Sequence, residues 1–204
     1  MGMKISDDVE RIDGTMANAY VISLGGKKVL VDAGTAGSGR KIVDFFKRSG
    51  SKPDFVLITH YHMDHVGGLR LIYDAFRPAI YAPGVEIPVI QGRQKMEMAR
   101  GLLARLVASF SKAKPVEEVL DVATLPLEGL KVIETPGHTP GSTSFLLERE
   151  RLIFVGDAVS TRGGKASVSR MFTYDSSNAL DSFDKIMGMK PITILPGHGE
   201  PLTI

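Results

Sequence analysis

The 204-residue sequence contains no cysteine and no tryptophan, and it contains only five histidines. Without cysteine there can be no disulfide bond and no thiolate ligand, so any bound metal ion must be held by nitrogen and oxygen atoms. The lack of cysteine also agrees with a cytoplasmic protein, and we expect that location.

A strong charge imbalance and long apolar runs are also missing. The net charge of +2 gives no electrostatic reason to expect a nucleic-acid or membrane partner. No run of about 18 apolar residues occurs, and the N-terminal stretch MGMKISDDVERIDG lacks the apolar segment of a signal peptide. With 43% hydrophobic and 24% charged residues, the composition is that of a globular protein.

Strand and helix patterns alternate along the first third of the chain, which predicts a sheet with helices packed on it. Strands are expected at 18–24, 28–32, 54–59 and 79–81, and helices at 41–48 and 66–76. In the last third we expect strands at 131–134, 143–147, 152–155 and 192–195, and a helix that Asp175 caps and that ends at about Met187.

The middle of the chain, over 91–110, places Met96, Ala99, Leu103, Leu106 and Phe110 along one helical face. We expect a helix there that packs on the core; a lid over a site and a dimer contact are the open alternatives. Because the sequence has no linker and no internal repeat, we predict one domain over residues 1–204 with a helical insertion around 84–114.

Three of the five histidines lie within the six residues from His60 to His65. On a helix, residues two apart point away from each other, so His60 and His62 would not share a metal ion there. At the end of a strand they lie on one face, and the apolar run 54–59 supplies that strand. The spacing therefore predicts metal ligands at the carboxyl end of a buried strand, where α/β proteins commonly place their active sites.

The remaining histidines have matching surroundings. His138 and His198 each follow an apolar run and a Pro-Gly turn, and Asp157 follows the apolar run LIFVG. Neutral imidazole and carboxylate groups suit zinc, iron, manganese or nickel. Five histidines with Asp64 and Asp157 make seven potential ligands, which is too many for one tetrahedral zinc ion but right for two metal ions that share a carboxylate.

In this order, the motifs THYHMDHVGG, PGHTPGS, FVGDA and PGHG resemble the signature of the metallo-β-lactamase-fold superfamily. The resemblance implies an αβ/βα sandwich, in which two mixed β-sheets lie face to face and helices cover the outer faces. It also implies the ligands: His60, His62 and His138 for one metal ion, Asp64, His65 and His198 for the second, and Asp157 as the bridge.

The implied activity is hydrolysis of an ester, thioester or lactone bond in a small molecule. Two divalent metal ions, zinc first and iron or manganese as alternatives, would hold a hydroxide that attacks the carbonyl carbon. Asp64 and His65 would be the catalytic pair, and Asp64 would also orient the nucleophile and shuttle its proton. Asp32, in LVDAG, would contact the metal ligands without binding a metal ion itself. The alternative is that Asp32 is only a turn residue at the end of a strand.

Within this family the ligand set is similar to that of the thioesterase hydroxyacylglutathione hydrolase (glyoxalase II), which is our leading specific interpretation. We expect no counterpart of that enzyme's C-terminal helical domain, and its basic glutathione-binding residues find no match in the sequence. A lactonase is the close alternative, but Ser160 stands where many such lactonases have a tyrosine, and Tyr174 would have to serve from another direction.

Two cations after Asp157, Lys165 and Arg170, are candidates to bind an anionic substrate group, and a solvated loop is the alternative.

Other reactions of the family also stay open. Persulfide dioxygenases look like glyoxalase II and use a single iron ion. A nuclease would be expected to show a more basic surface. Classical β-lactam hydrolysis agrees less well with the sequence, because those enzymes do not usually have both the aspartate and the histidine that stand here at Asp64 and His65. Homodimerisation is a further open alternative.

Overall fold

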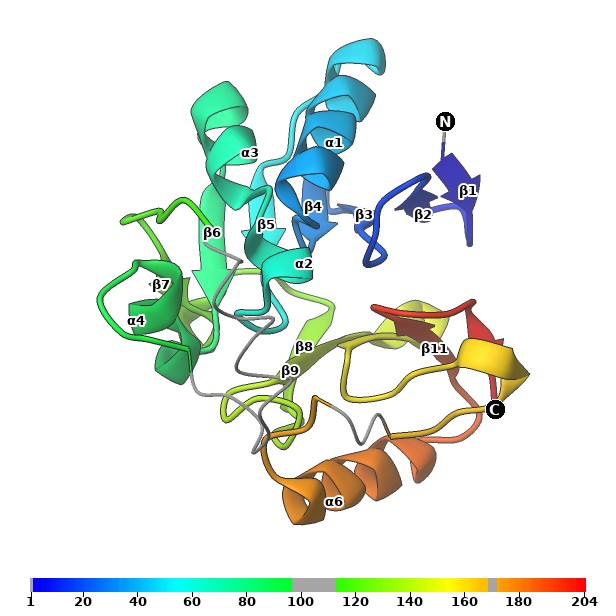
Figure 1. Cartoon of the computed structure of the whole chain (residues 1–204). Coiled ribbons are helices and arrows are strands. Elements are labelled where there is room, and N and C mark those ends of the chain that lie inside the picture. Colours follow the sequence, from blue (N-terminus) through cyan, green and yellow to red (C-terminus); the bar gives the residue numbers. More distant parts are fainter. Residues whose placement is uncertain (1, 97–112, 169–171) are drawn as a thin grey trace.

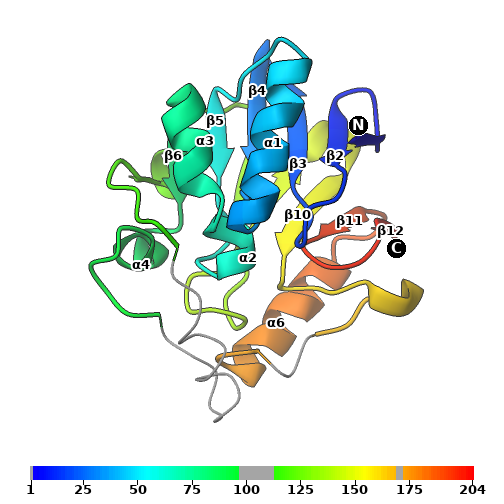
Figure 2. The ribbon, with the colours of Figure 1, turned by 45° about the horizontal axis from the view of Figure 1, so that its top comes forward.

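The computed structural model describes residues 2–96, 113–168 and 172–204. Two β-sheets lie face to face between layers of helices (Figure 1). Helices α1 (Ala36–Arg48) and α3 (Leu69–Phe76) cover the outer face of the first sheet, and α6 (Ser176–Met187) covers the outer face of the second. The turned view in Figure 2 shows the same helices on the first sheet. The predicted αβ/βα sandwich is therefore confirmed.

Within the described residues, the first sheet has seven strands in the order β1-β2-β3-β4-β5-β6-β7. Strands β1 to β4 pair antiparallel, whereas β4 to β7 run parallel. The carboxyl ends of β4, β5 and β6 consequently lie at the same edge of the sheet. The strands are β1 (Gly2–Lys4), β2 (Val9–Ile12), β3 (Tyr20–Leu24), β4 (Lys27–Val31), β5 (Phe55–Leu57), β6 (Ala79–Ala82) and β7 (Leu120–Asp121).

The second sheet, in the part of the chain that the structure describes, has five strands in the order β12-β11-β10-β9-β8. Strand β9 is antiparallel to both of its neighbours, and β10 is parallel to β11. Strands β8, β10 and β11 therefore point the same way and end at the same edge. The strands are β8 (Leu130–Glu134), β9 (Thr143–Leu147), β10 (Leu152–Gly156), β11 (Thr193–Pro196) and β12 (Leu202–Thr203).

Short helical elements connect the strands. They are α2 (Met63–Val66), α4 (Ile87–Ile90) and the 3-10 helices η1 (Gly84–Glu86), η2 (Val122–Thr124), η3 (Glu148–Glu150) and η4 (Arg162–Gly164). Residues 91–96 form a turn and a bend, so the helix expected from residue 91 does not begin there. The remainder of that expected helix, residues 97–110, lies outside the described residues. None of the helices in the described ranges is both long and apolar enough to cross a membrane.

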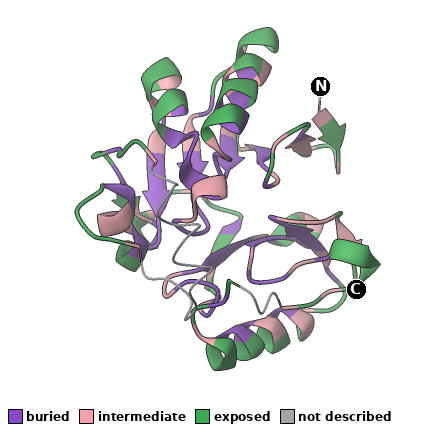
Figure 3. Cartoon of the chain, in the orientation of Figure 1, coloured by how far each residue is buried: buried purple, intermediate pink, exposed green. Residues whose placement is uncertain are grey.

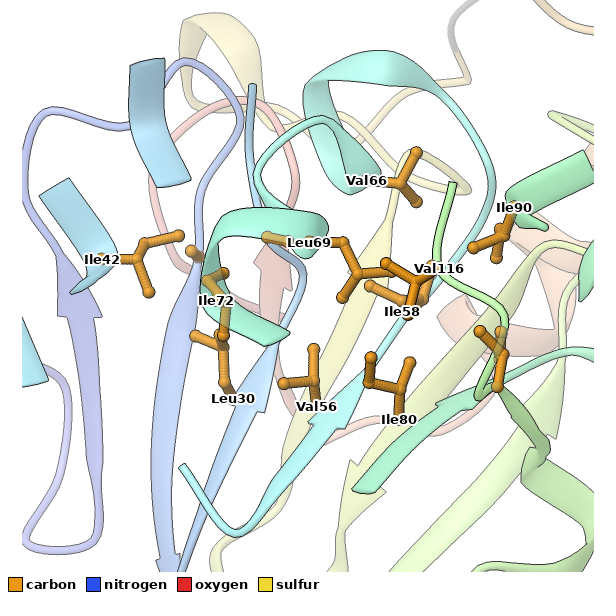
Figure 4. Close-up of a cluster of buried hydrophobic side chains, with 14 of the residues drawn as sticks. Leu30, Ile42, Val56, Ile58, Val66, Leu69, Ile72, Ile80, Ile90 and Val116 are labelled. Carbon is orange, nitrogen blue, oxygen red and sulfur yellow. The ribbon is translucent and has the colours of Figure 1, made fainter. Parts of the chain in front are cut away.

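Buried apolar side chains fill each interface between the layers, whereas the exposed residues of α1, α3 and α6 lie on their outer faces (Figure 3). Between the helices α1 and α3 and the first sheet, each fully buried aliphatic side chain contributes roughly 1.5–3 kcal/mol. Figure 4 shows this cluster, with labels on Leu30, Ile42, Val56, Ile58, Val66, Leu69, Ile72, Ile80, Ile90 and Val116.

The two sheets pack on each other through aromatic and aliphatic side chains. The rings of Tyr20 and Phe154 meet edge to face with their centroids 5.3 Å apart, and the Tyr20 hydroxyl donates a hydrogen bond of 2.8 Å to the Pro196 carbonyl. Ile153 and Ile194 of the second sheet pack with Ile186 of α6. The Asp175 cap is confirmed, because its carboxylate accepts from two backbone N–H groups in the first turn of α6.

Helix α1 begins at Ala36, five residues before the helix that the sequence predicted. The first turn contains two glycines, which lower helix propensity and hid the start. Thr35 caps the helix by accepting the Ser38 N–H at 3.2 Å. Gly39 is needed for packing, since a Cβ there would lie 2.5 Å from the Cα of Gly68.

The helix predicted over 66–76 is divided in the structure. Its residues belong to α2, which starts at Met63, and to α3, which starts at Leu69. Gly67 and Gly68 separate the two helices, and Gly68 lies against Gly39 of α1. The sequence also gave no prediction of β1, β2, β7 and β12, which are short strands or lie at the ends of the sheets.

Gly68→Ala is expected to destabilise the protein by about 1–3 kcal/mol, because its Cβ would collide with the Ala33 carbonyl and lie 2.6 Å from the Gly39 Cα. Gly37→Ala is the matched control in α1: its nearest neighbour is 3.7 Å away, so we expect it to stabilise by up to about 1 kcal/mol. Urea unfolding measures both variants. Equal urea midpoints for the two variants would contradict the close approach of α1 to the start of α3.

Candidate metal centre

All seven predicted ligands lie together where the carboxyl ends of strands from the two sheets face each other. They follow β5 (His60, His62, Asp64 and His65), β8 (His138), β10 (Asp157) and β11 (His198). The two edges are joined directly, because the Asn18 N–H donates to the Gly197 carbonyl at 2.7 Å and the Thr143 N–H donates to the Thr59 carbonyl at 3.0 Å.

Three imidazoles form what we call the first group: His60, His62 and His138. The His62 Nδ1 lies 3.1 Å from the His60 Nε2 and 2.9 Å from the His138 Nε2. Two nitrogens that bind one zinc ion with tetrahedral geometry are about 3.3 Å apart, so this spacing fits a shared ion.

Burial is the main cause that lowers the pKa of each imidazole in the first group. It holds the pKa of His60 well below its usual value, with the neighbouring His65 as the next cause, and it lowers the pKa of His62 to about 3. The pKa of His138 is also lowered. Neutral imidazole is the form that binds a metal ion, so the first group is in the protonation state that a metal requires.

A second group consists of Asp64, His65 and His198. The His198 Nε2 lies 2.9 Å from the Asp64 Oδ2, and the His65 Nε2 lies 3.9 Å from the same oxygen. Asp157 lies between the two groups: its oxygens are 3.4 Å from the His65 Nε2 and 3.5 Å from the His138 Nε2, and 3.6 Å from the His198 Nε2. Asp157 thus lies close to imidazoles of both groups.

Three buried polar atoms of these seven residues have no hydrogen-bond partner among the described residues: the His138 Nδ1, the His65 Nε2 and the Asp157 Oδ1. The last two lie 3.4 Å apart. Leaving such an atom unpaired costs about 1–3 kcal/mol, and a cation between the His65 Nε2 and the Asp157 Oδ1 would satisfy both of these atoms at once. Ligand atoms within 4.8 Å of one another occur in the first group, in the second group and in the set His60, His65 and Asp157. The donor set therefore fits divalent metal ions.

The carboxylates give the second group a different charge from the first. Burial works to lower the pKa of His65, but Asp32 and Asp157 outweigh it and hold that pKa well above its usual value. Burial works to raise the pKa of Asp64, but the hydrogen bond from His198 and the charge of His65 bring it down to about 2. A metal ion at the second group would therefore displace a proton from His65.

Asp32 contacts the ligand set directly. It follows β4, is 2% exposed, and adopts the left-handed backbone conformation with φ 62°. Its Oδ2 accepts the Nδ1–H of His65 at 2.7 Å and the Thr59 hydroxyl at 2.9 Å, while its Oδ1 accepts the Thr59 N–H at 2.9 Å. This arrangement leaves the Nε2 of His65 for a metal ion. Asp32 is thus more than a turn residue.

Sequence reasoning missed Asn18, which holds the loop that carries His198. Its side-chain amide donates to the carbonyls of Pro196 at 2.9 Å and Gly199 at 2.8 Å. A polar residue before the apolar strand YVISL was visible in the sequence, but nothing indicated a partner 178 residues away.

Glu86, in GVEIP, was also missed. It is fully buried and accepts hydrogen bonds from the loops that carry His62 and His138. An isolated glutamate next to a proline gives no signal of such a role in the sequence.

The substrate candidates lie in different surroundings. Lys165 is exposed after η4 and makes no hydrogen bond or ion pair with the seven ligands in the part of the chain that the structure describes. The backbone N–H of Tyr174 donates to the His138 carbonyl at 3.1 Å, and the residue is 44% exposed. Arg170 lies outside the described residues.

Comparison with known proteins gives the family. The family model described as "Metallo-beta-lactamase superfamily" matches residues 12–198. The Bacillus subtilis (strain 168) protein "Probable metallo-hydrolase YflN" is 29% identical, and the alignment covers 99% of this chain and 88% of that protein. The "Atrochrysone carboxyl ACP thioesterase" of Aspergillus fumigatus is 24% identical over 93% of this chain, which spans only 52% of that protein.

Among solved structures, the "Crystal structure of TTHA1623 in a di-iron-bound form" matches with a TM-score of 0.74 and 24% sequence identity, over 100% of this chain and 94% of that chain. At this identity the match shows the shared fold. The family match extends from β3 of the first sheet through β11 of the second and includes all seven clustered residues. The chain belongs to the metallo-beta-lactamase superfamily and is a metallo-hydrolase.

Proposed function

We propose that this protein is a dinuclear hydrolase that cleaves an ester, thioester or lactone bond of a small molecule. The observation that carries the proposal is the position of Asp157, whose oxygens lie 3.4–3.6 Å from imidazole nitrogens of both groups. When bound, two divalent ions, zinc first and iron or manganese as alternatives, supply an activated water and polarise the substrate carbonyl oxygen.

The seven residues divide the work of holding these ions. The first group would hold one ion, the second group the other, and Asp157 would contact both. His65 is oriented by its hydrogen bond to Asp32, which fixes the proton on Nδ1. Positioning by these side chains places the reacting groups before the substrate arrives, which lowers the entropic part of the barrier.

Asp64 is the carboxylate of the centre that faces solvent most. Its side chain is 28% exposed, against 14% for Asp157. Because its pKa is held to about 2, Asp64 is ionised at neutral pH and accepts hydrogen bonds. We propose that Asp64 orients the attacking water by accepting its hydrogen bond, and that Asp64 and His65 are the catalytic pair.

The leading substrate class is a thioester. It is supported by the ligand motif, which resembles that of glyoxalase II, and by the similarity to the Aspergillus thioesterase. Lactones are the alternative; Tyr174, held next to the His138 carbonyl, would then contact the substrate. Lys165 would bind an anionic substrate group. We further propose a cytoplasmic location and no nucleic-acid or membrane partner.

Metal analysis of protein purified without chelator is expected to give about two divalent ions per chain, matching the two groups that meet at Asp157. The loaded protein is then tested on thioesters, lactones, carboxylesters and a cephalosporin, and oxygen uptake is followed with glutathione persulfide. One iron ion per chain together with oxygen uptake would replace the hydrolase proposal by a dioxygenase. Protein that binds no metal ion would refute both.

Asp64→Asn is expected to lower kcat on the best of these substrates by about 10²–10⁴-fold, because the amide is a weaker acceptor for the attacking water. Asp74→Asn is the matched control: Asp74 is exposed on α3 and pairs with Arg70 at 2.9 Å, so its loss should leave kcat unchanged. A near-normal kcat for Asp64→Asn would remove Asp64 from the mechanism.

Asp32→Asn is expected to weaken metal binding at the second group by about 10–100-fold. Asparagine tolerates the positive φ of this position, so the change removes acceptor strength for the His65 Nδ1–H and the Thr59 donors without straining the backbone. Competition with a chromogenic chelator measures the affinities, with Asp74→Asn again as the control. Unchanged affinities would show that the Asp32–His65 contact serves the fold alone.

A further inference from the structure

Glu86 is a fully buried carboxylate that does not belong to the ligand set. It ends the short helix η1, which follows β6 of the first sheet (Figure 1). Burying a carboxylate is costly unless hydrogen bonds replace its contacts with water. The groups that donate to Glu86 therefore indicate what the buried carboxylate does.

One oxygen of Glu86 holds the loop after β5. The Oε2 accepts the backbone N–H of Tyr61 at 2.8 Å. Tyr61 lies between His60 and His62 in the sequence, so this bond fixes the peptide group that follows His60, inside the segment that carries two members of the first group. Tyr61 is itself buried, with 2% exposure.

The other oxygen holds the loop after β8. The Oε1 accepts the Thr139 hydroxyl at 2.8 Å and the Gly141 N–H at 2.7 Å. Thr139 directly follows His138, and its own N–H donates to the Ser142 hydroxyl at 2.9 Å. Gly141 leaves room for the carboxylate, since a Cβ there would lie 2.7 Å from the Glu86 Oε1.

These two loops come from different sheets. The backbone bond between Thr143 and Thr59 joins the strand ends, and Glu86 joins the loops beyond that bond. Its two oxygens thus set the distance between the pair His60 and His62 on one side and the third imidazole, His138, on the other. Ligands that are placed before the ion arrives bind it without a further ordering cost.

We propose that Glu86 is a positioning residue that clamps the two loops and thereby keeps the first group ready to bind a metal ion. The proposal rests on the proposed function in one respect, that a metal ion binds at this group. Glu86 acts on the ion through the backbone on either side of the ligands.

Glu86→Gln tests the clamp with almost no change of shape. A glutamine has one acceptor oxygen, so its NH₂ group must face either the Tyr61 N–H or the donors of Thr139 and Gly141. We expect the affinity of the first group to fall by about tenfold or more. Under chelator conditions that leave the wild type fully loaded, the variant should lose about one ion per chain, and the visible absorption of the cobalt-loaded protein should change.

The control is Asp54→Asn. Asp54 also accepts a backbone N–H, from Lys28 at 2.8 Å, but it lies at the opposite end of β5 from His60. Its substitution should lower stability without changing metal affinity or the cobalt spectrum. The metal affinities are compared well below the unfolding temperature of each metal-free variant, so that a general loss of stability does not enter the comparison.

A second pair of variants keeps Glu86 in place. Thr139→Val removes the hydroxyl that donates to Glu86, whereas Thr139→Ser retains it. We expect the valine variant to lose metal affinity in the same direction as Glu86→Gln and the serine variant to behave like the wild type. This pair decides the question if Glu86→Gln does not fold.

Wild-type metal affinity and an unchanged cobalt spectrum in both Glu86→Gln and Thr139→Val would overturn the clamp and leave the proposed function standing. The same would follow if Asp54→Asn lost as much affinity as Glu86→Gln. A wild-type protein that binds no metal ion would overturn the proposed function together with the clamp.

Discussion

The metal centre depends on holding the carboxyl edges of two sheets against each other. Neither sheet carries a complete set of ligands: the first supplies the segment from His60 to His65, and the second supplies His138, Asp157 and His198. Apolar packing between the sheets sets their distance but is not directional. Hydrogen bonds between the two edges are directional and fix how the sheets are aligned. Those of Asn18 and Glu86 are made to the loops that carry the ligands.

Burial and charge then give the two groups unlike properties. The first group contains only imidazoles, and burial keeps them neutral. The second group contains a carboxylate, and Asp32 and Asp157 keep His65 protonated in the absence of metal. Buried charge is tolerated here because each carboxylate faces a histidine. A metal ion would therefore bind at the first group without releasing a proton, whereas at the second group it would displace the proton of His65.

Features that depend on local spacing could be predicted from the sequence. The two-residue separation of His60 and His62 favours a position after a strand over a helix, and both lie in the loop after β5. Asp175 before a helical pattern predicts a cap. Features that depend on distant partners could not. Two glycines in the first turn of α1 disfavour a helix locally, and the sequence does not show that Gly39 packs against Gly68. Glu86 has hydrogen-bond partners 25 and 55 residues away.

Exposure within the centre shows from which side a substrate can approach. The side chains of His65 and His138 are 0% and 2% exposed, whereas those of His198 and Asp64 are 18% and 28% exposed. The deep residues are held by partners from the fold, including Asp32 at the inner nitrogen of His65. The open side consequently includes Asp64 and His198 of the second group and the half-buried His62 of the first. Asp64 is the more exposed of the two carboxylates, so the residue that we propose to orient the attacking water lies on the side of the centre that solvent reaches.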